Sequence, residues 1–171
     1  MGKLQDKVAL ITGSSSGIGR GVAIAFAREG AKVIVNYPDQ AEAQSAAAVR
    51  AEIERMGVQA LDVRADVSVE HEAQMLVDTV QRNFGRIDIL VNNAGIGTVA
   101  RVEAMPPGQW DRMIAVNLRS VFLCTHFVLP IMYRQDYGRI IRFVDSKAPR
   151  SDTFVRGGIT HLRGTRVPLL G

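Results

Sequence analysis

A glycine- and serine-rich turn near the N-terminus is the first segment whose residue types and spacing could do chemistry. It reads Thr12-Gly13-Ser14-Ser15-Ser16-Gly17-Ile18-Gly19 and directly follows an apolar run. Glycines let a backbone turn sharply and approach an anion closely, and the N-terminus of a following helix offers free N–H groups and a partial positive charge. The turn is therefore typical of a loop that binds a pyrophosphate.

The glycine spacing of this turn matches neither the general dinucleotide fingerprint nor a P-loop. It is G-x-x-x-G-x-G, which differs from the G-x-G-x-x-G of the general dinucleotide fingerprint, and no Gly-Lys-Ser/Thr follows as in a P-loop. A turn that only lets a strand pack closely against a helix would need the same glycines. The motif favours anion binding and leaves that packing role as the alternative.

Three further groups of polar residues follow or interrupt apolar segments, namely Asp66-Val67, Asn92-Asn93-Ala94-Gly95 and Asn117. An Asp carboxylate can accept a hydrogen bond from an adenine amino group, and an Asn amide both donates and accepts. Asp and Asn are also frequent in turns, so each group taken alone has a purely structural interpretation. Asn117 lies in an apolar stretch, where it needs a partner if it is buried or marks a local irregularity of the helix.

Strand-like and helix-like segments alternate over residues 1–141. Short apolar runs typical of buried strands occupy residues 7–12, 32–36, 59–66, 87–91 and 138–144. Amphipathic or helix-favouring segments occupy residues 18–29, 39–56 and 69–84, each closed by a glycine. The order predicts an α/β fold, a Rossmann-type doubly wound parallel sheet of about five strands. Right-handed crossovers would then bring the loops that follow the strands to one edge, where ligands bind.

The segment 110–134 is a long helix that is apolar almost all round, especially over 116–134. Such a helix is either enclosed in a core or packed against another subunit.

Taken together, the motifs resemble the short-chain dehydrogenase/reductase family, with a likeness to glucose dehydrogenases and 3-oxoacyl-carrier-protein reductases. T-G-x-x-x-G-I-G, the Asp-Val pair, N-N-A-G and V-N-L stand in the family's order and spacing over residues 7–141. The resemblance implies an NAD(P)-dependent oxidoreductase that transfers a hydride between nicotinamide and an alcohol or carbonyl substrate. The cofactor-binding residues that it implies are Gly13, Ser15, Gly17, Ile18, Gly19, Asn36, Asp66, Val67, Asn92, Ala94 and Gly95.

The same resemblance assigns further roles. Thr12 would tie the first strand to the N-N-A-G segment, and Asn117 would support a kink in its helix and, through water, the proton relay. The 116–134 helix would pack against its counterpart in a second copy, so we expect self-association. Residues 36–39 lie at the end of the second strand, where NAD preference asks for an acidic residue. Asn36 is neutral and Pro38 carries no charge, which favours NADP(H) and leaves NAD(H) open.

The sequence departs from the family at the proton-transfer machinery. The family's tyrosine, followed four residues later by a lysine on the same helix face, has no counterpart, since Tyr37, Tyr133 and Tyr137 are followed at that spacing by Ala, Tyr and Ile. Ser146 lies one position beyond the expected catalytic serine, and Phe143 precedes it where a hydroxyl would be needed. The alternative function is therefore a catalytically inactive fragment that retains only a dinucleotide half-site.

Charge separates the last thirty residues from the rest. Residues 1–141 hold 15 basic and 15 acidic side chains, so the net charge of +4 comes from residues 142–171. We expect residues 1–141 to form the NAD(P)-binding domain and 142–171 to be a basic tail outside the family, frameshifted or disordered, which would leave the strand at 138–144 with an exposed apolar edge. A tail put to another use, up to a basic interaction protein, is the rival reading, although basic tails are more often simply solvated and nucleic acid is a poor candidate partner.

The remaining composition excludes several classes of protein. No apolar run approaches the ~18 residues of a membrane helix, and the N-terminus has no signal-peptide pattern, so we expect a cytoplasmic protein without a membrane segment. One cysteine, Cys124, and three scattered histidines show no metal-ligand spacing, so no metal site is expected.

Overall fold

The fold is described from a computed structural model that covers residues 2–143, 155–156 and 163–166. Its larger sheet has the strand order β3-β2-β1-β4-β6-β8. The strands of this sheet are β1 (Val8–Ile11), β2 (Lys32–Tyr37), β3 (Ala60–Arg64), β4 (Ile89–Asn92), β6 (Arg139–Arg142) and β8 (Arg163–Arg166). All neighbouring pairs are parallel except β6 with β8. The predicted α/β fold with a parallel sheet of about five strands is confirmed, and β8 adds an antiparallel sixth strand.

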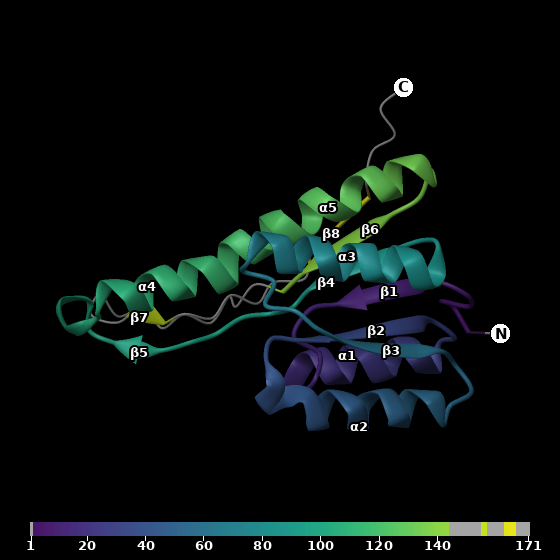
Figure 1. Cartoon of the computed structure of the whole chain (residues 1–171), viewed down its shortest axis with the longest axis horizontal. Helices are drawn as coiled ribbons and strands as arrows, with labels where there is room; N and C mark the ends of the chain where they lie inside the picture. The colour runs from purple at the N-terminus through teal and green to yellow at the C-terminus, as the bar shows by residue number, and fades with distance from the viewer. Residues whose placement is uncertain (1, 144–154, 157–162, 167–171) are drawn as a thin grey trace.

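Helices cover both faces of this sheet (Figure 1). On one face α1 (Gly17–Arg28) and α2 (Ala43–Glu54) pack against β1, β2 and β3, and on the other α3 (Glu70–Phe84) packs against α5 (Ser120–Arg134), which also contacts β4. Every residue of β1 and β4 is buried. This two-sided cover explains why the strands read as continuous apolar runs rather than as alternating ones.

Two apolar cores result, one on each side of the sheet. Val8 and Leu10 of β1 point toward α3 and α5, whereas Ala9 and Ile11 of the same strand point toward α1 and α2. The alternation follows from the two-residue period of a strand. β1 is therefore the central strand from which both helical layers are positioned.

The chain changes direction beside β1. It runs outward from β1 through β2 to β3 and then crosses back to β4, on the other side of β1. Leu10 is consequently paired with Ile34 of β2 and with Leu90 of β4. Such a reversal of strand order opens a crevice at the carboxyl ends of the strands, the usual ligand site of an open α/β sheet.

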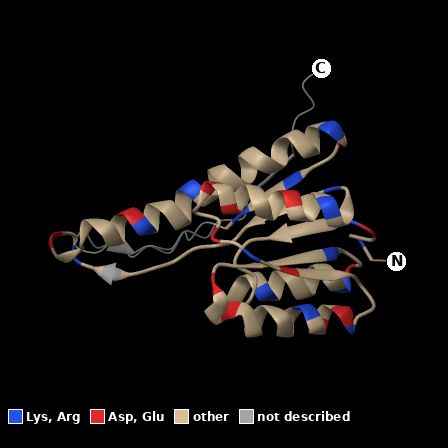
Figure 2. Ribbon diagram, viewed as in Figure 1, with Lys and Arg blue, Asp and Glu red and all other residues tan. Residues whose placement is uncertain are grey.

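The predicted long helix is observed as three consecutive parts. It consists of α4 (Pro107–Ile114), a π-helical stretch η3 (Ala115–Arg119) and α5. One face of α5 is buried, with Leu123 and Val128 in the core, whereas Phe122 on the opposite face is 64% exposed. In Figure 2 the ribbon of this helix is mostly tan, so few of its residues are charged. The segment is thus apolar on both faces, as predicted, and the described residues cover only one of them.

The helix from Pro107 to Arg134 is also long and apolar enough to cross a membrane by length and composition alone. Its best 18-residue window has a mean hydropathy of 1.6, and a third of that window is buried. Core helices of soluble proteins meet the same criterion, since an apolar face serves equally against protein or lipid. The prediction that the chain has no membrane segment therefore stays a prediction.

The other described elements are two 3-10 helices and a small second sheet. The 3-10 helix η1 (Gln40–Glu42) precedes α2, and the 3-10 helix η2 (Val102–Ala104) precedes α4. β5 (Val99–Ala100) pairs antiparallel with β7 (Val155–Arg156) as a second, two-stranded sheet.

The prediction that β6 would have an exposed edge was wrong. The backbone of β8 pairs with β6 along its whole length, from Arg139 opposite Arg166 to Arg142 opposite Arg163. β7 and β8 also show that two short segments of 142–171 adopt strand structure. Pairing satisfies backbone groups that an edge strand leaves open, and the partner lies too far along the chain for local pattern to reveal it.

Candidate functional site

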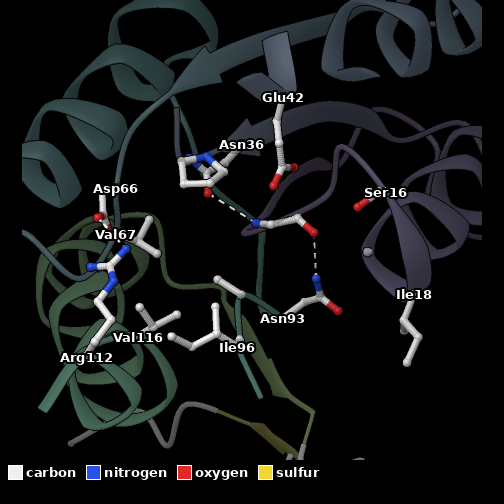
Figure 3. A pocket seen from close by; sticks show the side chains of 15 residues that line it. Ser16, Ile18, Asn36, Glu42, Asp66, Val67, Asn93, Ile96, Arg112 and Val116 are labelled. Carbon is white, nitrogen blue, oxygen red and sulfur yellow. Dashed lines mark hydrogen bonds and ion pairs between the residues drawn. The ribbon is translucent and has the colours of Figure 1, made fainter. Parts of the chain in front are cut away.

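A cavity of about 320 Å³ opens at the carboxyl ends of the central strands (Figure 3). Its lining comes from the glycine turn after β1, the ends of β2 and β3, the loop after β4, and the start of the long helix. The lining residues are Gly13, Ser16, Ile18, Gly19, Asn36, Pro38, Glu42, Asp66, Val67, Asn93, Ala94, Gly95, Ile96, Arg112 and Val116. The segments that the sequence singled out therefore meet at one place, in the crevice expected from the strand order.

Glycine is required at two positions of the turn. Gly13 has φ +60°, and a Cβ on it would lie 3.0 Å from the Cα of Ala94. A Cβ on Gly19 would collide with the amide nitrogen of Asn93 and the carbonyl oxygen of Gly13. The turn can follow this path only without side chains there, which brings its backbone against the loop after β4.

Thr12 and Asn93 lock that contact by hydrogen bonds. The Thr12 hydroxyl oxygen accepts from the backbone N–H groups of Asn93 and Ala94, both at 3.0 Å. In return the Asn93 amide nitrogen donates to the carbonyl oxygens of Thr12 at 2.9 Å and Gly13 at 2.8 Å. Thr12 thus ties β1 to the N-N-A-G segment, as the resemblance implied.

Asn36 is almost completely buried, at 1% exposure, at the end of β2. Its side-chain oxygen accepts from the Gly13 N–H at 3.2 Å, and its amide nitrogen donates to the carbonyl oxygens of Ala65 at 3.0 Å and Val63 at 3.3 Å. The side chain is therefore used to join the glycine turn to the end of β3. Asn36 lines the cavity, but its polar atoms are already engaged within the protein.

Asp66 lies where β3 ends, at the rim of the cavity. Its carboxylate accepts from the Ser68 hydroxyl at 2.6 Å and from the Ser68 N–H at 3.0 Å, and it pairs with the Arg112 guanidinium at 2.8 Å. Partial burial raises the pKa of this carboxyl, but the hydrogen bonds from Ser68 and Arg112 together outweigh it, so the pKa lies below its ordinary value. Asp66 is accordingly a charged acceptor at neutral pH.

Asn117 lies within the π-helical stretch η3, so the predicted irregularity of the helix is present. Its side-chain oxygen accepts from the Ile96 N–H, and its amide nitrogen donates to the Ile96 carbonyl oxygen, both at 2.8 Å. This reciprocal pair fastens the loop after β4 to the long helix. π-helical turns inside α-helices are frequent at functional sites.

Most of the sequence-predicted cofactor residues line the cavity, and three do not. Ser15 is buried, and its hydroxyl donates to the Glu42 carboxylate. Asn92 is buried at the end of β4, where its amide nitrogen lies 3.4 Å from the Thr125 hydroxyl. Gly17 begins α1 without being part of the lining.

The structure adds lining residues that the sequence reasoning missed, namely Ser16, Pro38, Glu42, Asn93, Ile96, Arg112 and Val116. Asn93 carried a signal, since it belongs to the N-N-A-G segment. Glu42 and Arg112 carried none, because they come from helices whose orientation toward the crevice depends on tertiary packing.

Ser146 and Cys124 are two other residues whose side-chain types could take part in chemistry. Ser146 lies outside the described residues. Burial of Cys124 raises the pKa of its thiol to about 12, which makes it unreactive. In the part of the chain that the structure describes, no three His, Cys, Asp or Glu side chains are grouped to hold a metal ion.

Comparison with known proteins identifies the family. Residues 7–154 match the family described as short chain dehydrogenase, so the chain belongs to the short-chain dehydrogenase/reductase oxidoreductases. The match covers the glycine turn, the Asp66 and Asn93 segments and the long helix.

Individual relatives give the same result. The chain is 46% identical over 138 residues to D-beta-hydroxybutyrate dehydrogenase of Cupriavidus necator, which covers 81% of this chain and 52% of the relative. It is 45% identical over 141 residues to 3-oxoacyl-[acyl-carrier-protein] reductase of Synechocystis, covering 82% and 56%. An oxidoreductase of Bacillus subtilis is 38% identical over 171 aligned positions, covering 95% and 60%.

A solved structure confirms the fold. A protein from Sinorhizobium meliloti 1021 assigned as a short-chain alcohol dehydrogenase superposes with a TM-score of 0.81 at 30% identity, covering 88% of this chain and 58% of that one. The chain thus spans somewhat more than half the length of the relatives that it matches.

Proposed function

We propose that this chain is the dinucleotide-binding part of an NAD(P)(H)-dependent oxidoreductase that acts on an alcohol or carbonyl carbon. The observation that carries the proposal is the glycine turn, which opens onto the cavity at the N-terminus of α1. Ser16, the residue that precedes this helix, lines the cavity and makes no side-chain capping bond to it. The helix end therefore keeps its positive partial charge for an anionic ligand.

The residues around the cavity fit a dinucleotide. A side chain at Gly13 or Gly19 would push the turn away from the loop after β4, and both glycines line the cavity, so the turn needs them to bring the start of α1 to a diphosphate. Asp66 and Val67 at the rim would hold adenine, the carboxylate as acceptor for the amino group. Ala94 and Gly95 would contact the side of the site toward nicotinamide. A bound nicotinamide supplies the hydride donor or acceptor.

Proton handling is the part of the reaction for which these 171 residues are not equipped. Tyr-x-x-x-Lys does not occur in the sequence. Asn117 holds the loop after β4 in place and would act as a positioning residue, because an amide does not titrate near neutrality. The chain would therefore bind the cofactor and turn over substrate slowly or not at all, which is the half-site alternative.

We further propose that the chain self-associates through the exposed face of its long helix. An apolar groove of about 590 Å³ on this face is lined by Ile114, Leu118, Arg119, Val121, Phe122, Thr125, His126 and Leu129. Phe122 and Leu118 are 64% and 51% exposed. Exposed apolar patches of this kind mark interaction sites, and a cytoplasmic protein would cover this one with a second copy.

Titration of the purified 171-residue chain with NADH and NADPH tests the cofactor assignment. Quenching of protein fluorescence and titration calorimetry should both report saturable binding of at least one of the two. The absence of binding by both methods, with the protein folded by circular dichroism, would refute the proposal.

A further inference from the structure

The cavity carries a carboxylate at the end where β2 leads into α2. Glu42 closes the short helix η1, whose start is capped by Asp39 through a 2.9 Å bond from the Ala41 N–H to the Asp39 carboxylate. The half-buried Glu42 side chain reaches the cavity (Figure 3). There it accepts a hydrogen bond from the hydroxyl of Ser15 in the glycine turn. Its negative charge is thus held in place on the wall beside the turn.

Glu42, rather than Asn36, is the side chain that can contact a ribose on this wall of the cavity. An acidic side chain near the end of the second strand commonly binds the ribose diol of NAD, and a basic one accommodates the 2′-phosphate of NADP. Asn36 stands at that strand end, but its amide is spent on Gly13, Val63 and Ala65. Pro38, which follows, has no polar side-chain atom, so Glu42 is the next polar side chain of this wall.

The charge balance of the lining opposes a phosphate in this corner. Among the lining residues, Glu42 and Asp66 are acidic and Arg112 is the basic one, and Arg112 is paired with Asp66 at 2.8 Å. Arg20, on the first turn of α1, is paired with Glu52 at 2.7 Å. A 2′-phosphate carries almost two negative charges near neutrality, so it would face a carboxylate while, within the described residues, these two arginines are already paired. A ribose hydroxyl, in contrast, can donate to that carboxylate.

We propose that Glu42 selects the cofactor by its charge, so that the site takes NAD(H) in preference to NADP(H). The inference rests on the proposed dinucleotide function and adds the specificity of the same site. This preference for NAD(H) is opposite to the preference for NADP(H) inferred from Asn36 and Pro38 in the sequence. Those two residues show only that the end of β2 carries no charge, whereas Glu42 adds a negative charge to the same wall of the cavity. Specificity here comes from repulsion of the wrong ligand as much as from binding of the right one.

Two fragments of the cofactors isolate the contribution of the phosphate. ADP-ribose and 2′-phospho-ADP-ribose differ only in that group, and calorimetric titration of the full chain with each gives the ratio of their Kd values. We expect ADP-ribose to bind at least about tenfold more tightly, and Glu42→Gln to reduce the ratio to within about threefold. Glu42→Arg should reverse it. The matched control is Glu54→Gln, a charge removal on α2 outside the cavity, which should leave the ratio unchanged.

The salt dependence of the wild-type ratio gives a second measurement that needs no variant. Repulsion is screened as salt rises, so the preference for ADP-ribose should shrink between about 0.05 and 0.5 M NaCl. Equal binding of the two fragments by the wild type, or a ratio that neither Glu42→Gln nor salt changes, overturns the role of Glu42 and leaves the dinucleotide site standing. Binding of neither fragment, nor of NADH, overturns the proposed function and this inference together.

Discussion

The side-chain oxygen of Asn36 accepts a hydrogen bond from the backbone N–H of Gly13 at 3.2 Å. Asn36 is the last residue but one of β2 and Gly13 lies in the turn after β1, so this bond joins the ends of two adjacent strands at the cavity that both residues line. The amide nitrogen of Asn36 extends the link to Ala65 at the end of β3. One buried side chain thus sets the relative positions of three segments that form the candidate site.

Asn36→Leu should lower the free energy of unfolding by about 1–3 kcal/mol, because it leaves a buried N–H and buried carbonyl groups without partners. Urea unfolding followed by circular dichroism measures this. The control is Asn83→Leu on the exposed side of α3, where Asn83 bonds to the Thr79 carbonyl. An effect of Asn36→Leu no larger than that of the control would show that the link is dispensable.

Asp66 should contribute stability that depends on pH. Its pKa in the folded protein lies below the ordinary value, so the contribution is present above about pH 4 and is lost as the pH falls through the lowered pKa. Asp66→Asn should therefore cost about 0.5–1 kcal/mol at pH 7, the range of a partly exposed ion pair, and nothing at strongly acidic pH.

Unfolding of both proteins in urea across this pH range provides the test. Asp111→Asn, which removes a carboxylate from the exposed surface of α4, serves as the control and should shift stability little at any pH. A cost of Asp66→Asn that stays constant down to the lowest pH would contradict the assignment.

The sequence predicted the order of strands and helices because that order is written in local pattern. Continuous apolar runs and closing glycines mark β1, β2, α1 and α3 without reference to the rest of the chain. The glycine turn was equally predictable, since its backbone path needs Gly13 and Gly19 for reasons of local space.

Side chains that reach the cavity from a distance were not predictable in the same way. Glu42 and Arg112 belong to helical segments, and their direction follows from how η1 and α4 pack beside the sheet. Asn92 is the last, buried residue of β4, whereas Asn93 follows the strand and lines the cavity; which of these two neighbours faces the ligand site depends on where the strand ends. The antiparallel β8 depends on contacts with a strand more than twenty residues earlier.

Phe122→Glu should convert an associated species to monomer, because it places a charge in the apolar groove of the long helix. Sedimentation velocity at several concentrations measures the change. Tyr133→Glu is the matched control, since Tyr133 is 48% exposed on the same helix and does not line the groove. A wild-type chain that sediments as a monomer at high concentration would contradict self-association.

Turnover by these 171 residues should be lower than that of a full-length relative with Tyr-x-x-x-Lys by roughly 10²–10⁴, the usual contribution of a positioned proton-transfer group. The assay uses NADH and NADPH with a panel of aldehydes, ketones and sugars. Turnover within about tenfold of the relative, a gap of only ~1.4 kcal/mol in barrier, would contradict the expectation. Ser146→Ala and Lys147→Ala would then show whether these residues have taken over the proton transfer.

The role of the glycine turn in cofactor binding is tested most directly by the binding of NADH to Gly13→Val and Gly57→Val. Both glycines have positive φ, +60° at Gly13 and +81° at Gly57, so both substitutions strain the backbone. Only Gly13 lies at the cavity, whereas a Cβ on Gly57 meets nothing within 4 Å. We expect wild type and Gly57→Val to bind NADH with similar Kd, and Gly13→Val, still folded by circular dichroism, not to bind. Unchanged affinity in folded Gly13→Val would contradict this role of the turn.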